Sequence, residues 1–377
     1  MRDVTIVGAG PVGLLLACVL LDHGLDVQVL EARELPVTHS RAIGIHPPAL
    51  VALERAGITE SVVAEAVHIG AGSAYSRGRR LGTVSFDLPG SRYPFVAALP
   101  QYRTQRLLVD AVTRRSPGAI LRGIEVLSVS RVPGGDGDHR DVRCVGGTQV
   151  FSARTVVGAD GPRGVVRDRA HARTISRRYP DTYVMGDFAD ETALGTEAAI
   201  FLEDSGVVES FPLPGGMRRW VAHWTAARHP ATAQGLAAEI SVRTGQRVDA
   251  GTVSMLSEFR PRRRVVRRML GEGVLLVGDA AHEISPMGGQ GMNLGWLDAV
   301  ACGDALAHFL RTGDRQPLLV AERARLAAAR AAARLAEFNM ACGRPLGDRA
   351  AAARNAAIRR LARSPWGPMA ARMFSMQ

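Results

Sequence analysis

Six residues near the N-terminus constrain the fold of this chain more than any other segment. Gly8-Ala9-Gly10-Pro11-Val12-Gly13 fits the pattern GxGxxG, and residues 3–7 before it form an apolar run typical of a buried strand. Residues 13–23 predict a helix that Gly24 closes, and residues 26–30 predict a second buried strand. Together these segments predict a βαβ unit, the mononucleotide-binding half of a doubly wound sheet.

The glycines of this motif have separate tasks. Gly8 allows a tight turn, Gly10 lets the backbone approach a pyrophosphate, and Gly13 lets the helix pack closely on the strand. The phosphates would lie at the N-terminus of the helix, where free N–H groups and the helix dipole favour negative charge. Glu31 ends the second strand, where its carboxylate can accept hydrogen bonds from a ribose 2′-hydroxyl. The unit therefore predicts a dinucleotide site and leaves NAD and FAD open.

Two later segments read as strands that end in a glycine–aspartate turn. Residues 154–161 read RTVVGADG, and residues 273–282 read GVLLVGDAAH. Residues 286–293, PMGGQGMN, follow the second turn. With these three motifs in this order, the chain resembles the group A flavoprotein monooxygenases, the para-hydroxybenzoate hydroxylase-like family.

The resemblance implies FAD as the cofactor. Asp279 matches an aspartate that binds ribityl or ribose hydroxyls, and Pro286 begins the loop beside the isoalloxazine ring. Asp160 matches a motif credited with FAD and nicotinamide binding. Two positions depart from the family pattern, since Gln105 stands where many relatives carry Glu, and Pro-Arg-Gly follows the Asp160-Gly161 pair. The residues expected to contact FAD are Gly8, Gly10, Pro11, Val12, Gly13, Glu31, Ala32, Arg33, Arg41, Gln101, Asp160, Gly278, Asp279, Pro286, Gly289, Gln290, Gly291, Met292 and Asn293.

The resemblance also implies a monooxygenase that takes electrons transiently from NADH or NADPH. In this family reduced flavin reacts with O2 to give a C4a-hydroperoxide, which hydroxylates an electron-rich carbon. The expected substrate is an aromatic or polycyclic small molecule of specialised metabolism, such as antibiotic biosynthesis. No catalytic residue is certain, and the candidates are Arg41, Pro286 and His223, the last also readable as structural.

The expected substrate pocket includes Met287 and Gly288 from the glycine-rich loop. Trp220 and Trp224 alternate on one face of a predicted strand. They could line an aromatic pocket or fill the core between sheet and helices.

Other functions on the same scaffold stay open. Epoxidation and Baeyer–Villiger insertion fit the same loop, and a flavin reductase that reduces an alkene is a rival enzyme class. A redox-inactive FAD-binding protein, a chaperone or cyclase, is a different class. Flavin-dependent halogenases use a lysine, and this chain contains none. Halogenation is therefore not expected.

The motifs predict an α/β fold with a Rossmann-like, glutathione reductase-type FAD-binding domain of residues 1–69, 100–168 and 262–305. Residues 70–99 and 169–261 are expected to form a substrate-binding domain with a mixed β-sheet. Residues 306–377 are expected to form C-terminal helices, as in a short form of the family without a thioredoxin-like domain.

Composition limits the remaining partners. The net charge is +11, which fits codon usage in a GC-rich genome or a basic field that attracts an anionic nicotinamide cofactor. No nucleic-acid-binding signature accompanies the charge, and the four cysteines lie too far apart in sequence to suggest a metal site. No apolar run approaches the ~20 residues that cross a bilayer, so a cytoplasmic protein is expected. The oligomeric state is left open.

Overall fold

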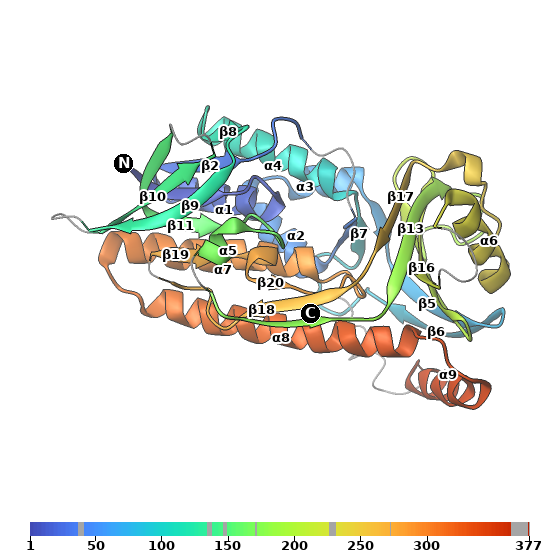
Figure 1. Ribbon diagram of the computed structural model, residues 1–377. Coiled ribbons are helices and arrows are strands. Elements are labelled where there is room, and N and C mark those ends of the chain that lie inside the picture. The colour runs from blue at the N-terminus through green and yellow to red at the C-terminus, as the bar shows by residue number, and fades with distance from the viewer. Residues whose placement is uncertain are drawn as a thin grey trace.

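The computed structural model describes residues 1–36, 41–133, 138–145, 149–169, 172–225, 231–271, 273–362 and 376. Two large sheets lie side by side in this part of the chain (Figure 1). The N-terminal strands lie in the first sheet, and α6 packs on the outer face of the second (Figure 1). The long helix α8 runs past both sheets (Figure 1).

The first sheet is parallel around the N-terminal βαβ unit. Its order is β8-β2-β1-β11-β10-β9, and β19 pairs with β11. The strands β8, β2, β1, β11 and β19 pair in parallel, whereas β9 and β10 pair in antiparallel fashion. The strands are β1 (Arg2–Val7), β2 (Val27–Glu31), β8 (Ile120–Arg122), β9 (Val126–Val132), β10 (His139–Cys144), β11 (Val150–Gly158) and β19 (Val274–Leu276). Strand β2 is buried throughout, as is typical of a parallel sheet covered on both faces.

Residues 126–144 contribute an antiparallel pair of strands to the first sheet. Strands β9 and β10 pair, β10 ends at Cys144 and β11 begins at Val150. Residues 134–137, between β9 and β10, lie outside the described residues. The segment therefore supplies two successive strands to the first sheet.

The second sheet is large and mostly antiparallel. Its order is β17-β13-β16-β15-β14-β5-β6, and only the pair of β14 and β5 is parallel among the described strands. Its strands are β5 (Ala71–Ser76), β6 (Arg79–Ser85), β13 (Thr182–Ala189), β14 (Ala198–Glu203), β15 (Gly206–Leu213), β16 (Met217–Trp224) and β17 (Met255–Phe259). One face packs on α6, and the other faces the first sheet.

Two small sheets connect the large ones. One has the order β3-β7-β4, from β3 (Gly44–Ile45), β4 (Val67–Ile69) and β7 (Val96–Ala98). The other has the order β12-β18-β20, from β12 (Thr174–Arg178), β18 (Arg262–Val266) and β20 (His282–Glu283).

Helices cover the sheets according to their apolar patterns. Helix α1 is apolar on nearly all sides because it is enclosed by the first sheet, α4 and α7. The alanine-rich α8 buries Leu326, Ala329, Ala333 and Ala336, a spacing that places them on one face. The α-helices are α1 (Pro11–Asp22), α2 (Pro47–Leu53), α3 (Thr59–Glu65), α4 (Gln101–Arg115), α5 (Val165–Arg169), α6 (Ala233–Thr244), α7 (Gly291–Thr312), α8 (Gln316–Gly343) and α9 (Asp348–Ala362). Short 3-10 helices are η1 (Glu54–Ala56), η2 (Ala250–Thr252) and η3 (Gly278–Ala280).

The architecture confirms the predicted fold class, an α/β fold with a Rossmann-like domain, a second mixed sheet and helices toward the C-terminus. The division into three parts by residue number stays a prediction. Among the described helices, none is long and apolar enough to span a membrane.

The packing of α1 on the opening loop gives a stability prediction. A Cβ on Gly13 would overlap the carbonyl oxygen of Gly8. We expect Gly13→Ala to lower the free energy of unfolding by about 1–3 kcal/mol, the usual cost of overpacking. Gly70→Ala is the control, because a Cβ at Gly70 meets no atom within 4 Å. Denaturant unfolding measures both, and equal stability of the two variants would contradict the packing argument.

Candidate functional site

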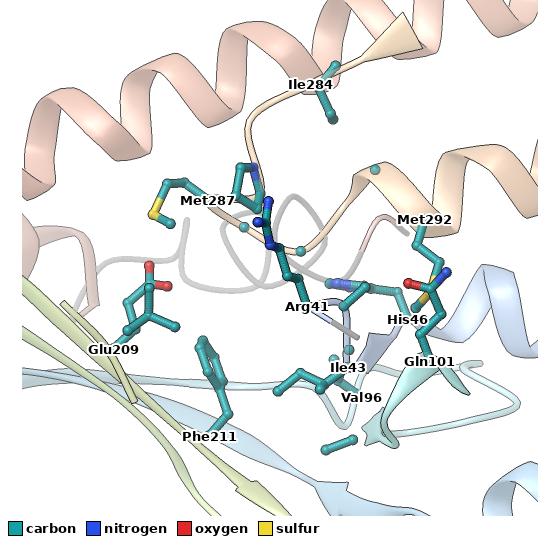
Figure 2. Close-up of a pocket in the computed structure, with 18 of the residues that line it drawn as sticks. Arg41, Ile43, His46, Val96, Gln101, Glu209, Phe211, Ile284, Met287 and Met292 are labelled. Atoms are coloured by element: carbon teal, nitrogen blue, oxygen red, sulfur yellow. The ribbon is translucent and has the colours of Figure 1, made fainter. Parts of the chain in front are cut away.

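A large cavity lies between the two large sheets. Its volume of about 1590 Å³ exceeds the about 300–1,000 Å³ of a pocket for one drug-sized ligand. The opening loop and strand ends of the first sheet line one part, and a face of the second sheet lines the other. Figure 2 shows Glu209 and Phe211 of the second sheet, with Met287 and Arg41 across the cavity from them. The cavity therefore has room for more than one small molecule.

The opening loop lies against strand β11. Gly8 has a φ of 107°, and a Cβ there would lie 2.5 Å from the carbonyl oxygen of Ala159. Packing within the protein thus requires glycine at Gly8. Gly10 differs, because the nearest protein atom to a Cβ there would be the same oxygen, 4.0 Å away, and Gly10 lines the cavity. The backbone at Gly10 is therefore accessible from the cavity, beside the N-terminus of α1, and this arrangement fits a bound phosphate.

Glu31 fixes this loop as well as facing the cavity. Its carboxylate oxygens accept hydrogen bonds from the backbone N–H groups of Ala9 (2.9 Å) and Arg33 (3.0 Å). Gln105 adds a hydrogen bond from Nε2 to the Ala9 carbonyl oxygen (2.7 Å). Since each carboxylate oxygen has two lone pairs, Glu31 can still accept from a ribose hydroxyl.

The two distant glycine–aspartate turns meet at one end of the first sheet. Strands β11 and β19 are parallel neighbours, so their carboxyl ends lie side by side. The buried guanidinium of Arg167 joins the turns by donating to Pro162 O (3.0 Å) and Ala280 O (3.3 Å). This arrangement brings Asp160 and Asp279 to the cavity.

Both aspartates keep acceptor capacity. Asp160 Oδ2 accepts from the Val166 N–H (3.0 Å), but its buried Oδ1 has no hydrogen-bond partner among the described residues. Burial raises the pKa of Asp160 and raises the pKa of Asp279 to about 6. Because an unsatisfied buried carboxylate is costly, both side chains are suited to accept hydrogen bonds from ligand hydroxyls.

A buried ionic network fixes the Asp279 turn from behind. Asp298 of α7 is fully buried and accepts hydrogen bonds from Arg325 Nε (2.7 Å) and the Gly278 N–H (3.0 Å). It also binds His282 Nε2. Burial lowers the pKa of His282, but the Asp298 carboxylate outweighs burial, and the net shift is upward. His282 thus supports the turn.

The loop after β20 lies along the cavity. Asn293 is fully buried and holds this loop, donating from Nδ2 to Gly289 O (2.7 Å) and Gly44 O (3.0 Å). Its Oδ1 accepts from the His46 N–H (2.9 Å). The loop residues that line the cavity are Pro286, Met287, Gly288, Gly289, Gly291 and Met292.

Arg41 lines the cavity and is positioned by the second sheet. Its guanidinium lies 5.7 Å from the centre of the Phe259 ring, within cation–π range. Its carbonyl oxygen accepts a hydrogen bond from Arg219. Arg219 in turn binds both oxygens of Asp187, at 2.6 and 2.7 Å, so its charge is compensated.

The sequence left two interpretations of Trp220 and Trp224 open, and the structure favours the core. Trp220 and Trp224 pack in the core between the second sheet and α6, and neither lines the cavity. Because side chains alternate along a strand, the opposite face carries the lining residues Arg219 and Val221.

His223, a catalytic candidate from the sequence, does not line the cavity. Its Nε2 lies 3.4 Å from an oxygen of Asp181, and its ring packs edge-on against Tyr183. Burial lowers the pKa of His223 although Asp181 opposes the shift. His223 therefore has a structural environment.

The expected cofactor residues divide into a lining set and a supporting set. The residues that line the cavity are Gly8, Gly10, Pro11, Val12, Glu31, Ala32, Arg33, Arg41, Gln101, Asp160, Asp279, Pro286, Gly289, Gly291 and Met292. The residues that lie outside the lining are Gly13, Gly278, Gln290 and Asn293.

Sequence reasoning missed Glu209. It is the only charged residue of β15, and it lines the cavity between Val207 and Phe211 on the same strand face. The available signal was a carboxylate inside an otherwise apolar, strand-like run.

The network behind Asp279 gives a second stability prediction. Removing the Asp298 carboxylate leaves the buried His282 and the half-buried Arg325 without this partner. We expect Asp298→Ala to cost about 3–5 kcal/mol of unfolding free energy, as when one partner of a buried ion pair is deleted. Asp110→Ala, an exposed change on α4, is the control and should be near neutral. Denaturant unfolding measures both variants, and a near-neutral Asp298→Ala would show that the network does not hold the turn.

Comparisons with known proteins agree with this geometry. Residues 1–336 match the family model described as FAD binding domain. The 6-methylpretetramide 4-monooxygenase of Streptomyces rimosus is 32% identical over 326 residues, which are 84% of this chain and 58% of that protein. The chain thus spans less than two thirds of this relative's length.

Two solved structures extend the comparison over the whole chain. The anhydrotetracycline hydroxylase of Streptomyces rimosus has a TM-score of 0.81 at 27% identity, covering 100% of this chain and 76% of that one. A Diels-Alderase from pyrroindomycin biosynthesis has a TM-score of 0.83 at 25% identity, covering 100% and 80%. The chain therefore belongs to the FAD binding domain family, the family of the group A, para-hydroxybenzoate hydroxylase-like flavoproteins.

Proposed function

We propose that this chain binds FAD in the cavity and uses NADH or NADPH and O2 to hydroxylate an aromatic or polycyclic small molecule. One observation carries the proposal. The same cavity joins a phosphate-compatible loop at Gly10 to an apolar sheet face around Val221. A cofactor bound at the Gly10 end of the cavity can therefore contact an apolar substrate bound at the Val221 end without either leaving the cavity.

Residues that line the cavity fit the parts of FAD. The open backbone at Gly10 and the N-terminus of α1 would hold the pyrophosphate, and Glu31 would accept from the adenosine ribose. Asp279 would accept from the ribityl hydroxyls, since none of the described residues satisfies its carboxylate. The loop at Gly288 and Gly289 would lie beside the flavin ring. When bound, FAD would supply the redox chemistry that activates O2.

The substrate end of the cavity is suited to exclude water. Met185, Val221 and Ile200 come from neighbouring strands of the second sheet, line the cavity and belong to one apolar cluster with Met287. Phe211 lies across the cavity from Met287 (Figure 2). Apolar walls favour an aromatic ligand and limit hydrolysis of reactive species. Arg41 supplies a cation at the boundary between the two ends (Figure 2).

A second function is favoured by one comparison. The similar Diels-Alderase indicates that this fold also serves a protein named for a cyclisation. The second candidate is therefore an FAD-binding cyclase without redox turnover. Oxygen transfer separates the two functions.

The cofactor assignment predicts a difference between two glycine variants. Gly10→Ala should fold normally, because its Cβ has space, but should block the approach of the pyrophosphate. We expect FAD affinity to fall tenfold or more, about 1.4 kcal/mol, by flavin fluorescence titration. Gly70→Ala should bind FAD as the unchanged protein does. Normal FAD affinity of Gly10→Ala would contradict the assignment.

The reaction predicts substrate-stimulated consumption of NADH or NADPH by the FAD-loaded protein. Polycyclic phenols should accelerate nicotinamide oxidation, and mass spectrometry should find one labelled oxygen in the product under isotopically labelled O2. Products without label would refute oxygen insertion. Cyclised products without nicotinamide consumption would support the second candidate.

A further inference from the structure

Glu209 occupies an unusual place on the second sheet. Residues paired across neighbouring strands have side chains on the same face. The row through Glu209 is Ser257, Met185, Val221, Glu209, Ile200, Ala74 and Gly82. Glu209 is the only charged residue in this row.

The neighbours along β15 continue the apolar surroundings. Val207 and Phe211 lie two residues on either side and line the cavity with Glu209. Figure 2 shows the Glu209 carboxylate facing the space below Met287. The carboxylate therefore projects from an apolar wall into the substrate end of the cavity.

Two guanidinium groups near this wall are held by other partners, whereas the guanidinium of Arg41 lies over the Phe259 ring. Arg219 is bound to Asp187, and Arg354 donates to the carbonyl oxygens of Cys342 (3.0 Å) and Leu202 (2.7 Å). No hydrogen bond or ion pair joins Glu209 to another residue in the described parts of the chain. Burial alone raises the pKa of Glu209 to about 7.

Two further ionisable groups face this region. Burial raises the pKa of Tyr183 on β13, and the negative charges of Asp181 and Glu209 raise it further. His223 on β16 is paired with Asp181. Neither residue neutralises Glu209, so above its pKa of about 7 it bears the desolvation cost of an unpaired carboxylate.

A ligand hydroxyl would remove this cost. An O–H···O⁻ hydrogen bond to a carboxylate is short and stronger than one between neutral groups. We infer that Glu209 binds the aromatic substrate by accepting a hydrogen bond from a phenolic hydroxyl, so that the cavity selects hydroxylated rings over unsubstituted ones. The inference rests on the proposed function, which is the source of the aromatic ligand.

Calorimetric titration at pH 8, where Glu209 is ionised and can only accept, tests the inference with 2-naphthol and 2-methoxynaphthalene. The two probes are similar in size and only the first can donate. The unchanged protein should bind 2-naphthol at least tenfold more tightly. Glu209→Leu should lose this preference and keep its affinity for 2-methoxynaphthalene. Glu258→Leu changes an exposed carboxylate on the same sheet and should keep the preference. Equal binding of both probes by the unchanged protein, or a preference that survives in Glu209→Leu, would overturn the inference.

Thermal unfolding tests independently whether the Glu209 carboxylate lacks a partner within the protein. The folded-state pKa of about 7 lies above the ordinary value of 4.5, so the folded protein retains a proton that the unfolded chain releases. Stability associated with Glu209 therefore falls as pH rises from about 4.5 through 7. Glu209→Leu should melt higher than the unchanged protein at pH 8, and the difference should shrink toward pH 5. A lower melting temperature of Glu209→Leu at pH 8 would show that the protein itself satisfies the carboxylate and would overturn the inference.

The outcome is separable from that of the proposed function. Flavin content and nicotinamide oxidation are measured on the same preparations. If both are normal and the probe preference does not depend on Glu209, only this inference fails. If both are absent and the preference depends on Glu209, the hydroxyl site stands and the monooxygenase proposal fails.

Discussion

The close approach of Gly8 to Ala159 is the contact on which the rest of the site depends. It exists because β1 and β11, about 150 residues apart in the chain, pair in parallel and end at the same level. A side chain at Gly8 would separate these ends. Since β19 joins β11 on its other side, the same edge also receives the Asp279 turn. One backbone contact thus sets the geometry of three distant motifs.

The carboxylates in and around the cavity differ according to their hydrogen-bond partners. Glu31 is satisfied by backbone N–H groups and mainly holds the loop. Asp298 is satisfied by Arg325 and His282 and holds a turn without facing the cavity. Asp279 and Glu209 have no such partners among the described residues and project into the cavity. The division between supporting and ligand-facing acids therefore follows from local hydrogen bonding, because only an unsatisfied acid gains from a ligand donor.

The second sheet combines stability and selectivity on opposite faces. Its outer face packs Trp220 and Trp224 against α6 and forms an ordinary core. Its inner face pairs Arg219 with Asp187 and thereby positions the Arg41 carbonyl. The apolar remainder of this face forms the wall of the substrate end. Cofactor and substrate ends meet because the sheet lies across the cavity from the loop at Met287 (Figure 2).

The sequence by itself determined the βαβ unit, the order of the cofactor motifs and most of the lining that they provide. These features are local, since glycine spacing and strand-ending aspartates carry their geometry within a few residues. Only the tertiary structure decided which face of β16 meets the cavity. Alternation separates Trp220 from Val221, but the position of α6 determines which one is covered. The same holds for Glu209. Its lack of a partner depends on which face of the sheet meets the cavity and on what lies across the cavity from it, and neither can be derived from β15 alone.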